Sequence, residues 1–496
     1  MGKGTDEFCN IVRIAILFQV PSYWPTLESF YKACLDDQSI EVRIFLLDET
    51  CVERVQMEHA KGFLEENNLD YELFSNDIIK EFSPHVAILQ PPYDMLYRNE
   101  RATSFHLKQL GVRIVYIPYG IEIADTEDAH WNHFFPFTVL NAWRIYTFSE
   151  LMKMDYDKYC PNRGAVRALG LPRFDYYKRI EVFNKKRNHE KKTVLWKLHF
   201  PKIITNGLDR IRVTPELDEY IKFAKRIEKH NDLEFIIMPH PMFFSENIDK
   251  SLSEKAQFLF EILNKQENVK IDYDSDYRKS FYNVDAIIVD RSALLVEAAF
   301  CNVPVLYMKN YEYEEPLTNA IKPIVSSYRQ GYSEEDMARF IEMFKNGDLE
   351  NDIEKISIQR DKYIPLADGY CGKRILNDIK AGIKERSIYS KPRVILFGTG
   401  AVCKYYIDRW EKSEFKKLEI IGLSDNDRKK WGTIQYGFKV YCPEELGSLN
   451  FDKILIMTEQ FYMPIKKKLV YELFLPEEKI IRIDHFLEGL IEGSDL

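Results

Sequence analysis

Apolar residues along this chain form short runs that alternate with amphipathic stretches. Short apolar runs are typical of buried strands in a parallel sheet, whereas apolar positions three or four apart are typical of helices. In the first part of the chain this pattern predicts strands at 11–18, 41–48, 85–90, 112–118 and 144–149. The segments between them have helical length, for instance 26–35 and 51–67. The alternation is the signature of a parallel α/β sheet.

The same alternation returns in the second part of the chain. Strands are predicted at 193–200, 233–240, 268–273, 285–290 and 303–308. Helices are predicted at 215–229, 248–264, 277–282, 293–300, 334–345 and 369–386. The charged stretch at 176–192 is predicted to connect the two parts with a basic face. It is either a solvated linker or a docking strip for anionic lipid head groups or an anionic polymer.

A third part begins near Lys391 with a strand, a glycine turn and a helix. Because 496 residues are too many for one core, several domains are expected. The pattern predicts three Rossmann-like domains, at 10–178, 190–388 and 391–496. The fold class is therefore α/β.

The composition is that of a soluble globular protein, with 45% hydrophobic and 30% charged residues. The net charge of −9 argues against general binding to nucleic acid. The eight cysteines are scattered without zinc-ligand spacing, so reduced thiols and no metal are expected. The first apolar run is interrupted by Arg13, and no run reaches transmembrane length. We expect a cytoplasmic protein whose membrane contact, if any, is peripheral.

Polar residues with candidate chemistry follow the strand at 285–290. Asp290, Arg291 and Ser292 lie between this strand and the helix predicted at 293–300. Ligands of open α/β sheets bind at the carboxyl ends of the strands, and a helix N-terminus there suits a phosphate. The segment therefore predicts a cradle for a nucleotide diphosphate, with an ordinary strand–helix joint as the alternative. Glu297 either accepts from a ribose hydroxyl or pairs with Lys or Arg.

Two more strand ends in the second part carry polar residues. Lys197 and His199 end the strand at 193–200 and could reach an anion in the cleft, or simply face solvent. His240 lies between Pro239 and Pro241, which restrain the backbone around it. A histidine held in this way is a candidate for acid/base chemistry or phosphate contact.

In the first part, the strand at 112–118 is followed by Tyr119 and Gly120. Gly120 permits a sharp exit from the strand. Glu122 and Asp125 then lie beyond the carboxyl edge of the sheet. We assign these four residues to the acceptor side, with a plain loop as the alternative.

The order of these motifs resembles the CDP-glycerol glycerophosphotransferase family of teichoic-acid and capsule polymer enzymes. The family's Gly-x-Pro-Arg-x-Asp element is matched by Gly170, Pro172, Arg173 and Asp175, its His-Pro by His240 and Pro241, and its Asp-Tyr-Ser-Ser turn by Asp290 and Ser292. The resemblance covers roughly 10–385. It implies a two-domain GT-B fold, with Arg173, Asp290 and Ser292 at the donor nucleotide and its phosphates. From their own positions in the chain, His199, Arg291 and Glu297 are assigned to the same donor site.

The chain departs from this family in two places. Arg291 and Ala293 replace the Tyr and the second Ser of the turn. The family's His-Gly-Thr motif, which supplies its candidate general base, corresponds here to Tyr119, Gly120 and Ile121. Tyrosine is a poor base at neutral pH. Either Glu122 or Asp125 takes this role, or the acceptor differs, or the chemistry is not glycerophosphate transfer.

The third part carries a dinucleotide-type glycine turn at Gly398 and Gly400, followed by Asp425 at the spacing of a ribose-binding acid. Cys403 stands in place of the third glycine. The turn belongs either to a nucleotide site, which an NAD(P)-linked oxidoreductase would need, or to a scaffold or oligomerisation module.

The resemblance, taken with the strand-end residues, implies a transferase of bacterial surface-polymer synthesis. It would move glycerol phosphate or a related polyol phosphate from a CDP-activated donor to a glycan or polymer acceptor. Both a free acceptor and a lipid-linked acceptor are considered. The candidate catalytic residues are His240, Glu122 and Asp125, and His240 and Arg291 would stabilise charge. No cofactor beyond the donor nucleotide is expected.

The alternatives are a GT-B glycosyltransferase that uses a nucleotide sugar and a non-catalytic nucleotide-binding assembly protein. The inner face of the cell membrane is a further candidate location, and the oligomeric state stays open.

Overall fold

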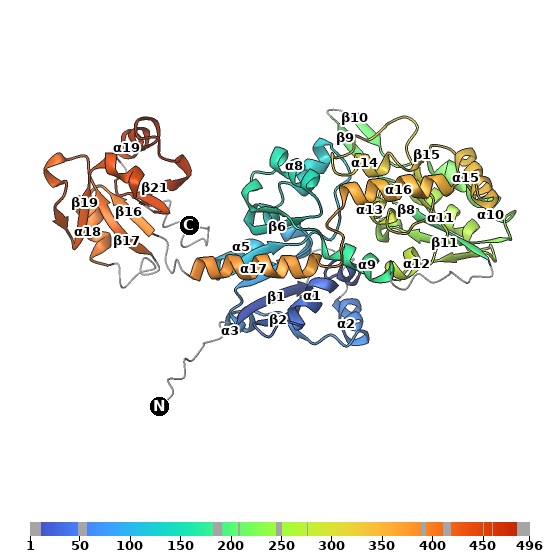
Figure 1. The fold of residues 1–496 in the computed structure, drawn as a ribbon, viewed down its shortest axis with the longest axis horizontal. Coiled ribbons are helices and arrows are strands. Elements are labelled where there is room, and N and C mark those ends of the chain that lie inside the picture. Colours follow the sequence, from blue (N-terminus) through green and yellow to red (C-terminus); the bar gives the residue numbers. More distant parts are fainter. Residues whose placement is uncertain are drawn as a thin grey trace. The chain divides into compact units, whose positions relative to one another are not determined.

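The computed structural model describes residues 11–47, 57–181, 191–206, 209–244, 250–274, 276–387, 393–409, 418–449, 451–458 and 460–483 (Figure 1). The chain divides into two compact units. The first consists of the chain up to Ser104 together with Arg113–Asp378, and the second of Phe105–Val112 together with the chain from Ile379 onward. Each unit is described by itself.

The first half of the first unit is built on a parallel sheet with the strand order β3-β2-β1-β4-β5-β6-β7. Its strands are β1 (Val12–Phe18), β2 (Ile40–Leu46), β3 (Tyr71–Leu73), β4 (Val86–Leu89), β5 (Arg113–Tyr116), β6 (Ala142–Thr147) and β7 (Val166–Ala168). Its helices are α1 (Glu28–Leu35), α2 (Met57–Glu66), α3 (Asn76–Phe82), α4 (Asp94–Tyr97), α6 (Glu127–His133), α7 (Phe137–Asn141), α8 (Glu150–Tyr159) and α9 (Asp175–Glu181). The chain reverses its direction of strand addition between β1 and β4, as in a Rossmann sheet.

The second half repeats this plan with the order β12-β11-β8-β13-β14-β15. Its strands are β8 (Lys192–Leu198), β11 (Leu233–Pro239), β12 (Val269–Ile271), β13 (Ala286–Val289), β14 (Val305–Met308) and β15 (Arg329–Gly331). A separate antiparallel hairpin joins β9 (Ile203–Asn206) to β10 (Asp209–Arg212). The helices are α10 (Leu217–Ile227), α11 (Lys250–Leu263), α12 (Arg278–Tyr282), α13 (Leu294–Ala298), α14 (Lys322–Val325), α15 (Glu334–Asn346) and α16 (Glu350–Tyr363).

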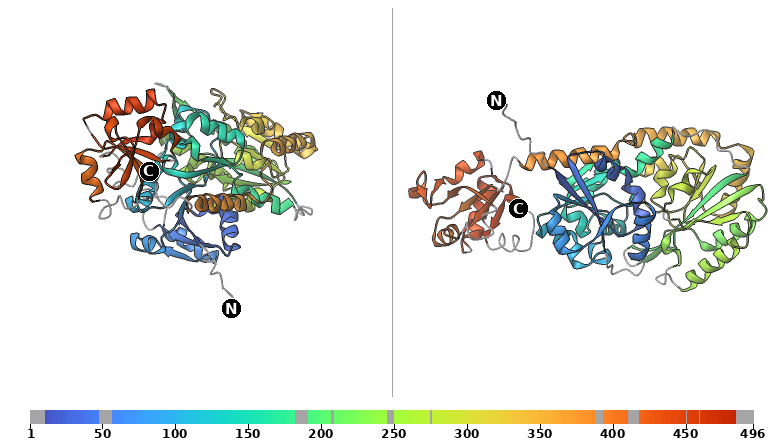
Figure 2. Two further views of the ribbon diagram at one scale, coloured as in Figure 1. Left: turned by 60° about the vertical axis from the view of Figure 1, so that its left-hand side comes forward. Right: turned by 90° about the horizontal axis from the view of Figure 1, so that it is seen from below.

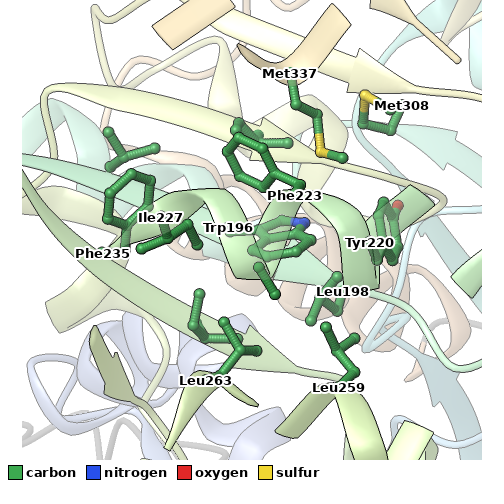
Figure 3. Packing of buried hydrophobic residues seen from close by; sticks show 14 of the residues in the cluster. Trp196, Leu198, Tyr220, Phe223, Ile227, Phe235, Leu259, Leu263, Met308 and Met337 are labelled. Atoms are coloured by element: carbon green, nitrogen blue, oxygen red, sulfur yellow. The ribbon is translucent and has the colours of Figure 1, made fainter. Parts of the chain in front are cut away.

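One face of this second sheet is held by an apolar core around Trp196 of β8. The Trp196 ring packs edge-on against Tyr220 and Phe223 of α10, with ring centroids 5.2 Å away in both cases. Leu259 of α11 and Met337 of α15 belong to the same buried cluster (Figure 3). Because close-packed interiors allow little movement, this core fixes where β8 and its neighbours end.

Helix α17 (Cys371–Ser387) follows the second half but packs on the first. Figures 1 and 2 show its orange ribbon beside the blue elements of the first half. The carboxylate of Asp175 accepts hydrogen bonds from the backbone N–H groups of Cys371 and Gly372, both at 2.9 Å. Asp378 accepts from Arg144 and from the hydroxyl of Tyr146. The helix therefore ties the two halves together.

The second unit contains a third sheet with the order β18-β19-β17-β16-β20-β21. Its strands are β16 (Arg393–Phe397), β17 (Glu419–Ser424), β18 (Ile434–Gln435), β19 (Phe438–Tyr441), β20 (Lys453–Ile456) and β21 (Ile480–Arg482). All neighbours pair in parallel except β18 with β19. Helices α18 (Ala401–Ile407) and α19 (Tyr462–Lys467) accompany this sheet.

The strands predicted from the apolar runs are all present, with ends shifted by a few residues. Several details differ, including the β9–β10 hairpin and helix α16, which were not predicted. Residues 176–181 of the expected basic connection belong to helix α9, while 182–190 lie outside the described residues. The helix expected at 293–300 is the five-residue α13. The short edge strands β3, β7 and β15 were not predicted. The domain boundaries stay a prediction.

Among the described residues, no helix is both long enough and apolar enough to span a bilayer.

Candidate functional site

The predicted strand-end residues of the second half meet where its strand order reverses, between β8 and β13. His199 follows β8 and Asp290 follows β13. The buried Asp290 carboxylate accepts the backbone N–H of His199 at 2.8 and 3.0 Å and the Tyr220 hydroxyl at 3.1 Å. Asp290 is thus an anchor that joins two strand ends. The carboxyl edge at such a reversal is the usual ligand position in an open α/β sheet.

Lys197 lies beside Asp290 and is also buried. Its Nζ donates to the backbone carbonyls of Leu198 and Met238, at 3.3 Å each. Burial raises the pKa of Asp290 and lowers that of Lys197, and the attraction between the two charges opposes both shifts. If a ligand placed a second anion at this edge, that anion would attract the ammonium of Lys197 in the same way as Asp290 does and would further favour its charged form.

His199 and His240 lie next to each other, with ring centroids 4.8 Å apart. Burial, followed by the charges of His240 and Arg291, lowers the pKa of His199 well below its usual value, so this imidazole is neutral near pH 7. Its Nδ1 lies 2.7 Å from the Phe200 carbonyl and must donate there, which leaves Nε2 as an acceptor. The Nδ1 of His240 accepts the backbone N–H of Met242 at 3.0 Å, so Nε2 of His240 carries a proton and donates. The His199 Nε2 acceptor thus lies in the imidazole next to His240.

Arg291 and Ser292 continue the edge after Asp290. The Arg291 Nε lies 3.0 and 2.8 Å from the two carboxylate oxygens of Glu315. A terminal nitrogen of the same guanidinium is 3.8 Å from Glu122 of the first half. The Ser292 hydroxyl oxygen accepts the backbone N–H of Leu294 at 3.1 Å, which leaves its own proton to donate. Because α13 has only five residues, its dipole contributes less than the sequence suggested.

In the first half, the two candidate carboxylates Glu122 and Asp125 each lie against a histidine of α6. Glu122 contacts Nε2 of His133 through one carboxylate oxygen and accepts the backbone N–H of Ala124 at 2.7 Å through the other. Burial alone would raise the pKa of Glu122, but His133, Arg291 and the Ala124 N–H lower it to about 2. Asp125 lies 2.7 Å from Nε2 of His130. Burial raises the pKa of Asp125, but hydrogen bonds from Tyr159 and His130 lower it, and the net shift is a decrease.

The Tyr119 ring is stacked on Tyr23, with ring centroids 4.1 Å apart. Gly120 has open space where a side chain would project. Both residues follow β5 (Arg113–Tyr116), at the carboxyl edge of the first sheet, and their role on the acceptor side stays a prediction.

Arg173 and Glu297, both assigned to the donor, are paired with each other across the two halves. Arg173 donates to the two Glu297 oxygens at 3.2 and 2.9 Å. It also donates to the Tyr119 carbonyl at 3.2 Å and lies 3.3 Å from the Tyr277 hydroxyl, which donates to Glu297 at 2.7 Å. Of the two roles that the sequence leaves open for Glu297, the structure contains the pairing with arginine. These groups are satisfied without a ligand.

A stretch after β14 joins the two halves through the backbone. The N–H of Asp125 donates to the Pro316 carbonyl at 2.8 Å, and the N–H of Thr318 donates to the Ile123 carbonyl at 3.0 Å. A cavity of about 630 Å³ lies along this stretch. Its lining contains one predicted site residue, Asp125, and further polar residues that include Lys309, Asn319 and Lys322. The cavity adjoins the strand-end cluster and does not coincide with it.

In the second unit the glycine turn is tied to its own neighbours. Gly398 has a φ of +99°, a conformation that favours glycine. Asp425 accepts from both the N–H and the hydroxyl of Thr399, at 2.9 and 2.6 Å, and pairs with Lys430 at 2.9 Å. Burial raises the pKa of Asp425, but hydrogen bonds from Lys430 and Thr399 lower it, and the resulting pKa is about 2. Nucleotide binding at Gly398, Gly400 and Asp425 stays a prediction, and here Asp425 already holds the turn.

Several residues of the site were not found from the sequence. Glu315 lies in the stretch after β14, and its position beyond a buried strand is a signal that was available. Tyr220, Tyr277 and His133 lie on or beside helices, and no local pattern marks their long-range contacts.

Comparisons with known proteins bear on the fold. A family model described as C2185-like, N-terminal, matches residues 390–481. No curated protein matches the chain. Among solved structures, the S. aureus MnaA-UDP co-structure has a TM-score of 0.51 at 15% identity, covering 75% of this chain and 97% of that one. A putative UDP-N-acetylglucosamine 2-epimerase from Listeria monocytogenes has a TM-score of 0.51 at 14% identity, covering 76% and 97%. The wall teichoic acid polymerase TagF has a TM-score of 0.49 at 13% identity, covering 77% and 92%.

The first two likenesses confirm the fold class. The chain has a GT-B-type pair of Rossmann-like domains, followed by a third small Rossmann-like domain.

Proposed function

We propose that the first unit binds a nucleoside-diphosphate-activated donor at the carboxyl ends of β8, β11 and β13 and transfers the activated group to a polymer acceptor. The observation that carries the proposal is the gathering of His199, His240 and Arg291 around the Asp290 anchor at the strand reversal. A diphosphate needs donors and positive charge at one place, and these residues come from three strand ends.

The chemistry follows from the donors that the site offers. The Nε2–H of His240 and the Ser292 hydroxyl are neutral donors, and Arg291 is a fixed positive charge. Together they would stabilise the negative charge that develops on the leaving nucleotide as its bond to the transferred group breaks.

For the transferred group we propose glycerol phosphate or a related polyol phosphate from a CDP-linked donor. The support is that three motifs resembling those of the CDP-glycerol glycerophosphotransferase family occur in the family's order along the chain. Their matched residues are Gly170, Arg173, Asp175, His240, Asp290 and Ser292. The acceptor would be a glycan or polyol-phosphate polymer of the bacterial surface, bound near Tyr119 and Gly120.

A second candidate is a reaction of a nucleotide sugar. It is favoured by the two solved structures with TM-scores above 0.5, one a co-structure with UDP and the other a putative UDP-N-acetylglucosamine 2-epimerase. The Tyr119–Gly120 sequence in place of His-Gly also fits a reaction other than glycerophosphate transfer.

The test is a binding and turnover panel on the full chain with CDP, CDP-glycerol, CDP-ribitol, UDP-sugars and GDP-sugars. The wild type is compared with Ser292→Ala/His240→Ala and with a control that changes His59 on α2 and Ser448 of the second unit to alanine. We expect a CDP compound to raise the melting temperature, because a ligand that binds only the folded state stabilises it. We expect the site variant to bind that compound at least about tenfold more weakly than the wild type, a loss of about 1.4 kcal/mol in binding free energy.

The outcomes separate the candidates. Release of CMP from CDP-glycerol in the presence of acceptor favours polyol-phosphate transfer. Turnover of a UDP- or GDP-sugar moves the assignment to nucleotide-sugar chemistry. Equal binding by wild type and site variant would show that the ligand lies elsewhere, and no binding at all would contradict the proposal.

A further inference from the structure

Helix α6 places two histidines one turn apart, and each lies against one of the carboxylates that were candidate bases. His133 pairs with Glu122 and His130 with Asp125. The N-terminus of α6 is fixed by Thr126, whose hydroxyl accepts the backbone N–H of Ala129. An ion pair of 3.2 Å between Asp128 and Lys202 holds the helix to the second half. The two imidazoles are therefore positioned by the fold.

Glu122 is poorly suited to take a proton from a substrate. Its side chain is 7% exposed, and both of its oxygens are engaged, one by His133 and the other by the Ala124 N–H. A carboxylate held in this way orients an imidazole and stabilises its protonated form. The His133 side chain is 27% exposed, so the histidine is the member of the pair that a substrate can reach.

His133 is connected to the donor edge, whereas His130 is not connected in this way. Glu122 lies 3.8 Å from the guanidinium of Arg291, the residue that follows the Asp290 anchor. His130 instead stacks on Tyr159, with ring centroids 3.7 Å apart, and its partner Asp125 also contacts Tyr159. The groups His133, Glu122 and Arg291 thus run from the acceptor side to the donor phosphates.

We propose that His133 is the general base for the acceptor hydroxyl, with Glu122 as its positioning residue; this rests on the proposed function. His133 Nδ1 takes the proton of the acceptor hydroxyl. The acceptor oxygen forms a bond to the phosphorus that carries the polyol, and the bond from that phosphorus to the bridging oxygen breaks. The nucleoside monophosphate leaves with that oxygen, and the proton passes from His133 to solvent. This assignment supplies the base that Tyr119 cannot be.

The test compares His133→Ala with His130→Ala, a matched histidine on the same helix. Donor binding is measured by thermal shift with the nucleotide of the donor, and transfer by release of nucleoside monophosphate in the presence of acceptor. We expect H133A to bind the nucleotide within about twofold of wild type and to transfer about 10²–10⁴-fold more slowly, the usual contribution of a general base. Added imidazole should restore part of the H133A rate, and H130A should transfer within a few-fold of wild type.

The failures are distinguishable. If the wild type neither binds nor turns over any activated donor, the proposed function fails and the His133 assignment falls with it. If the wild type is active and H133A transfers as fast, His133 is not the base while the proposed function stands. Loss of nucleotide binding in H133A, or a slow H133A that imidazole does not rescue, would also overturn the assignment. Should H133A melt below the assay temperature, His133→Gln carries the same comparison.

Discussion

At the scale of single residues, the buried carboxylates of the first unit act mainly on their protein neighbours. Asp290 accepts from His199 and Tyr220, and Glu122 holds His133. Each would leave an uncompensated donor or cation if it were removed, and such losses are costly in a dry environment. The sequence pattern marks these residues as functional because they follow strands. The structure shows that their first effect is to fix the groups around them.

The Glu122 pair predicts how stability depends on pH. The pKa of Glu122 is about 2 in the folded chain and 4.5 in its ordinary state. The unfolded chain therefore binds more protons between these values, so the stabilisation is present above about pH 4.5 and is lost as the pH falls toward 2. By this difference the stabilisation is on the order of 3 kcal/mol. In Glu122→Gln the loss of melting temperature between pH 6 and pH 3 should be smaller than in wild type.

The control for this measurement is Glu335→Gln, which changes an exposed glutamate of α15. Its melting temperatures should follow those of the wild type at every pH. An unchanged pH dependence in the Glu122 variant would contradict the prediction.

The Arg173–Glu297 pair predicts strong coupling between two residues of different halves. Removing one partner of a buried ion pair leaves an uncompensated charge, at a cost of about 3–5 kcal/mol. Arg173→Met and Glu297→Met should each destabilise by about this amount. The double variant should lose less than the sum of the two, because neither charge remains. Chemical denaturation of the four chains measures the cycle. Additive losses, or loss of nucleotide binding without loss of stability, would instead favour a direct role at the donor.

At the scale of elements, α17 depends on close contact with α1. A side chain at Gly372 would come within 2.6 Å of the backbone of Ser29 and Phe30. Its N-terminus is capped by Asp175, which also accepts from the hydroxyl of Ser29. The Gly-x-Pro-Arg-x-Asp element thus seats the helix that crosses between the halves.

This contact predicts opposite effects for two glycine substitutions. Gly372→Ala should destabilise by more than about 1 kcal/mol, since the added carbon meets backbone atoms that cannot rotate away. Gly62→Ala in α2 has open space around the new methyl group and should stabilise by about 0.5–1 kcal/mol through helix propensity. Melting temperatures of the two variants and the wild type test both signs. A stable Gly372→Ala protein would show that α17 tolerates displacement.

The elements also show what the sequence can and cannot predict. Buried strands such as β8 and β13 are marked by uninterrupted apolar runs, because both faces of a central parallel strand are covered. Edge strands such as β15, with the sequence Arg-Gln-Gly, carry no such run. The strand-end residues of the site could be predicted for the same reason as the strands. Their partners could not, because Glu122 and Thr318 are 196 residues apart and only the tertiary fold brings them together.

At the scale of the whole molecule, the chain consists of two compact units, and the matched family model lies in the second. Each unit has its own apolar core. The second contains Val394, Leu396, Cys403 and Leu455 in one cluster, and Cys403 stands there in place of the third glycine of a dinucleotide turn. Separate cores make independent unfolding the expectation.

Calorimetry tests this independence. We expect the full chain to unfold in more than one transition. Asp425→Asn should lower only one of them, because it weakens the acceptor for Thr399 and Lys430 within the second unit. The donor nucleotide should raise only the other, through binding to the first unit. A single transition shifted by both the substitution and the nucleotide would show that the two units unfold together.

The backbone pairing between 123–125 and 316–318 has a consequence for how this protein can vary through evolution. Hydrogen bonds between main-chain groups tolerate almost any side chain but require both segments to keep their length and path. Related chains with the same link should therefore differ freely in side chains along these segments. Insertions and deletions should collect instead in other surface loops, such as the β9–β10 hairpin.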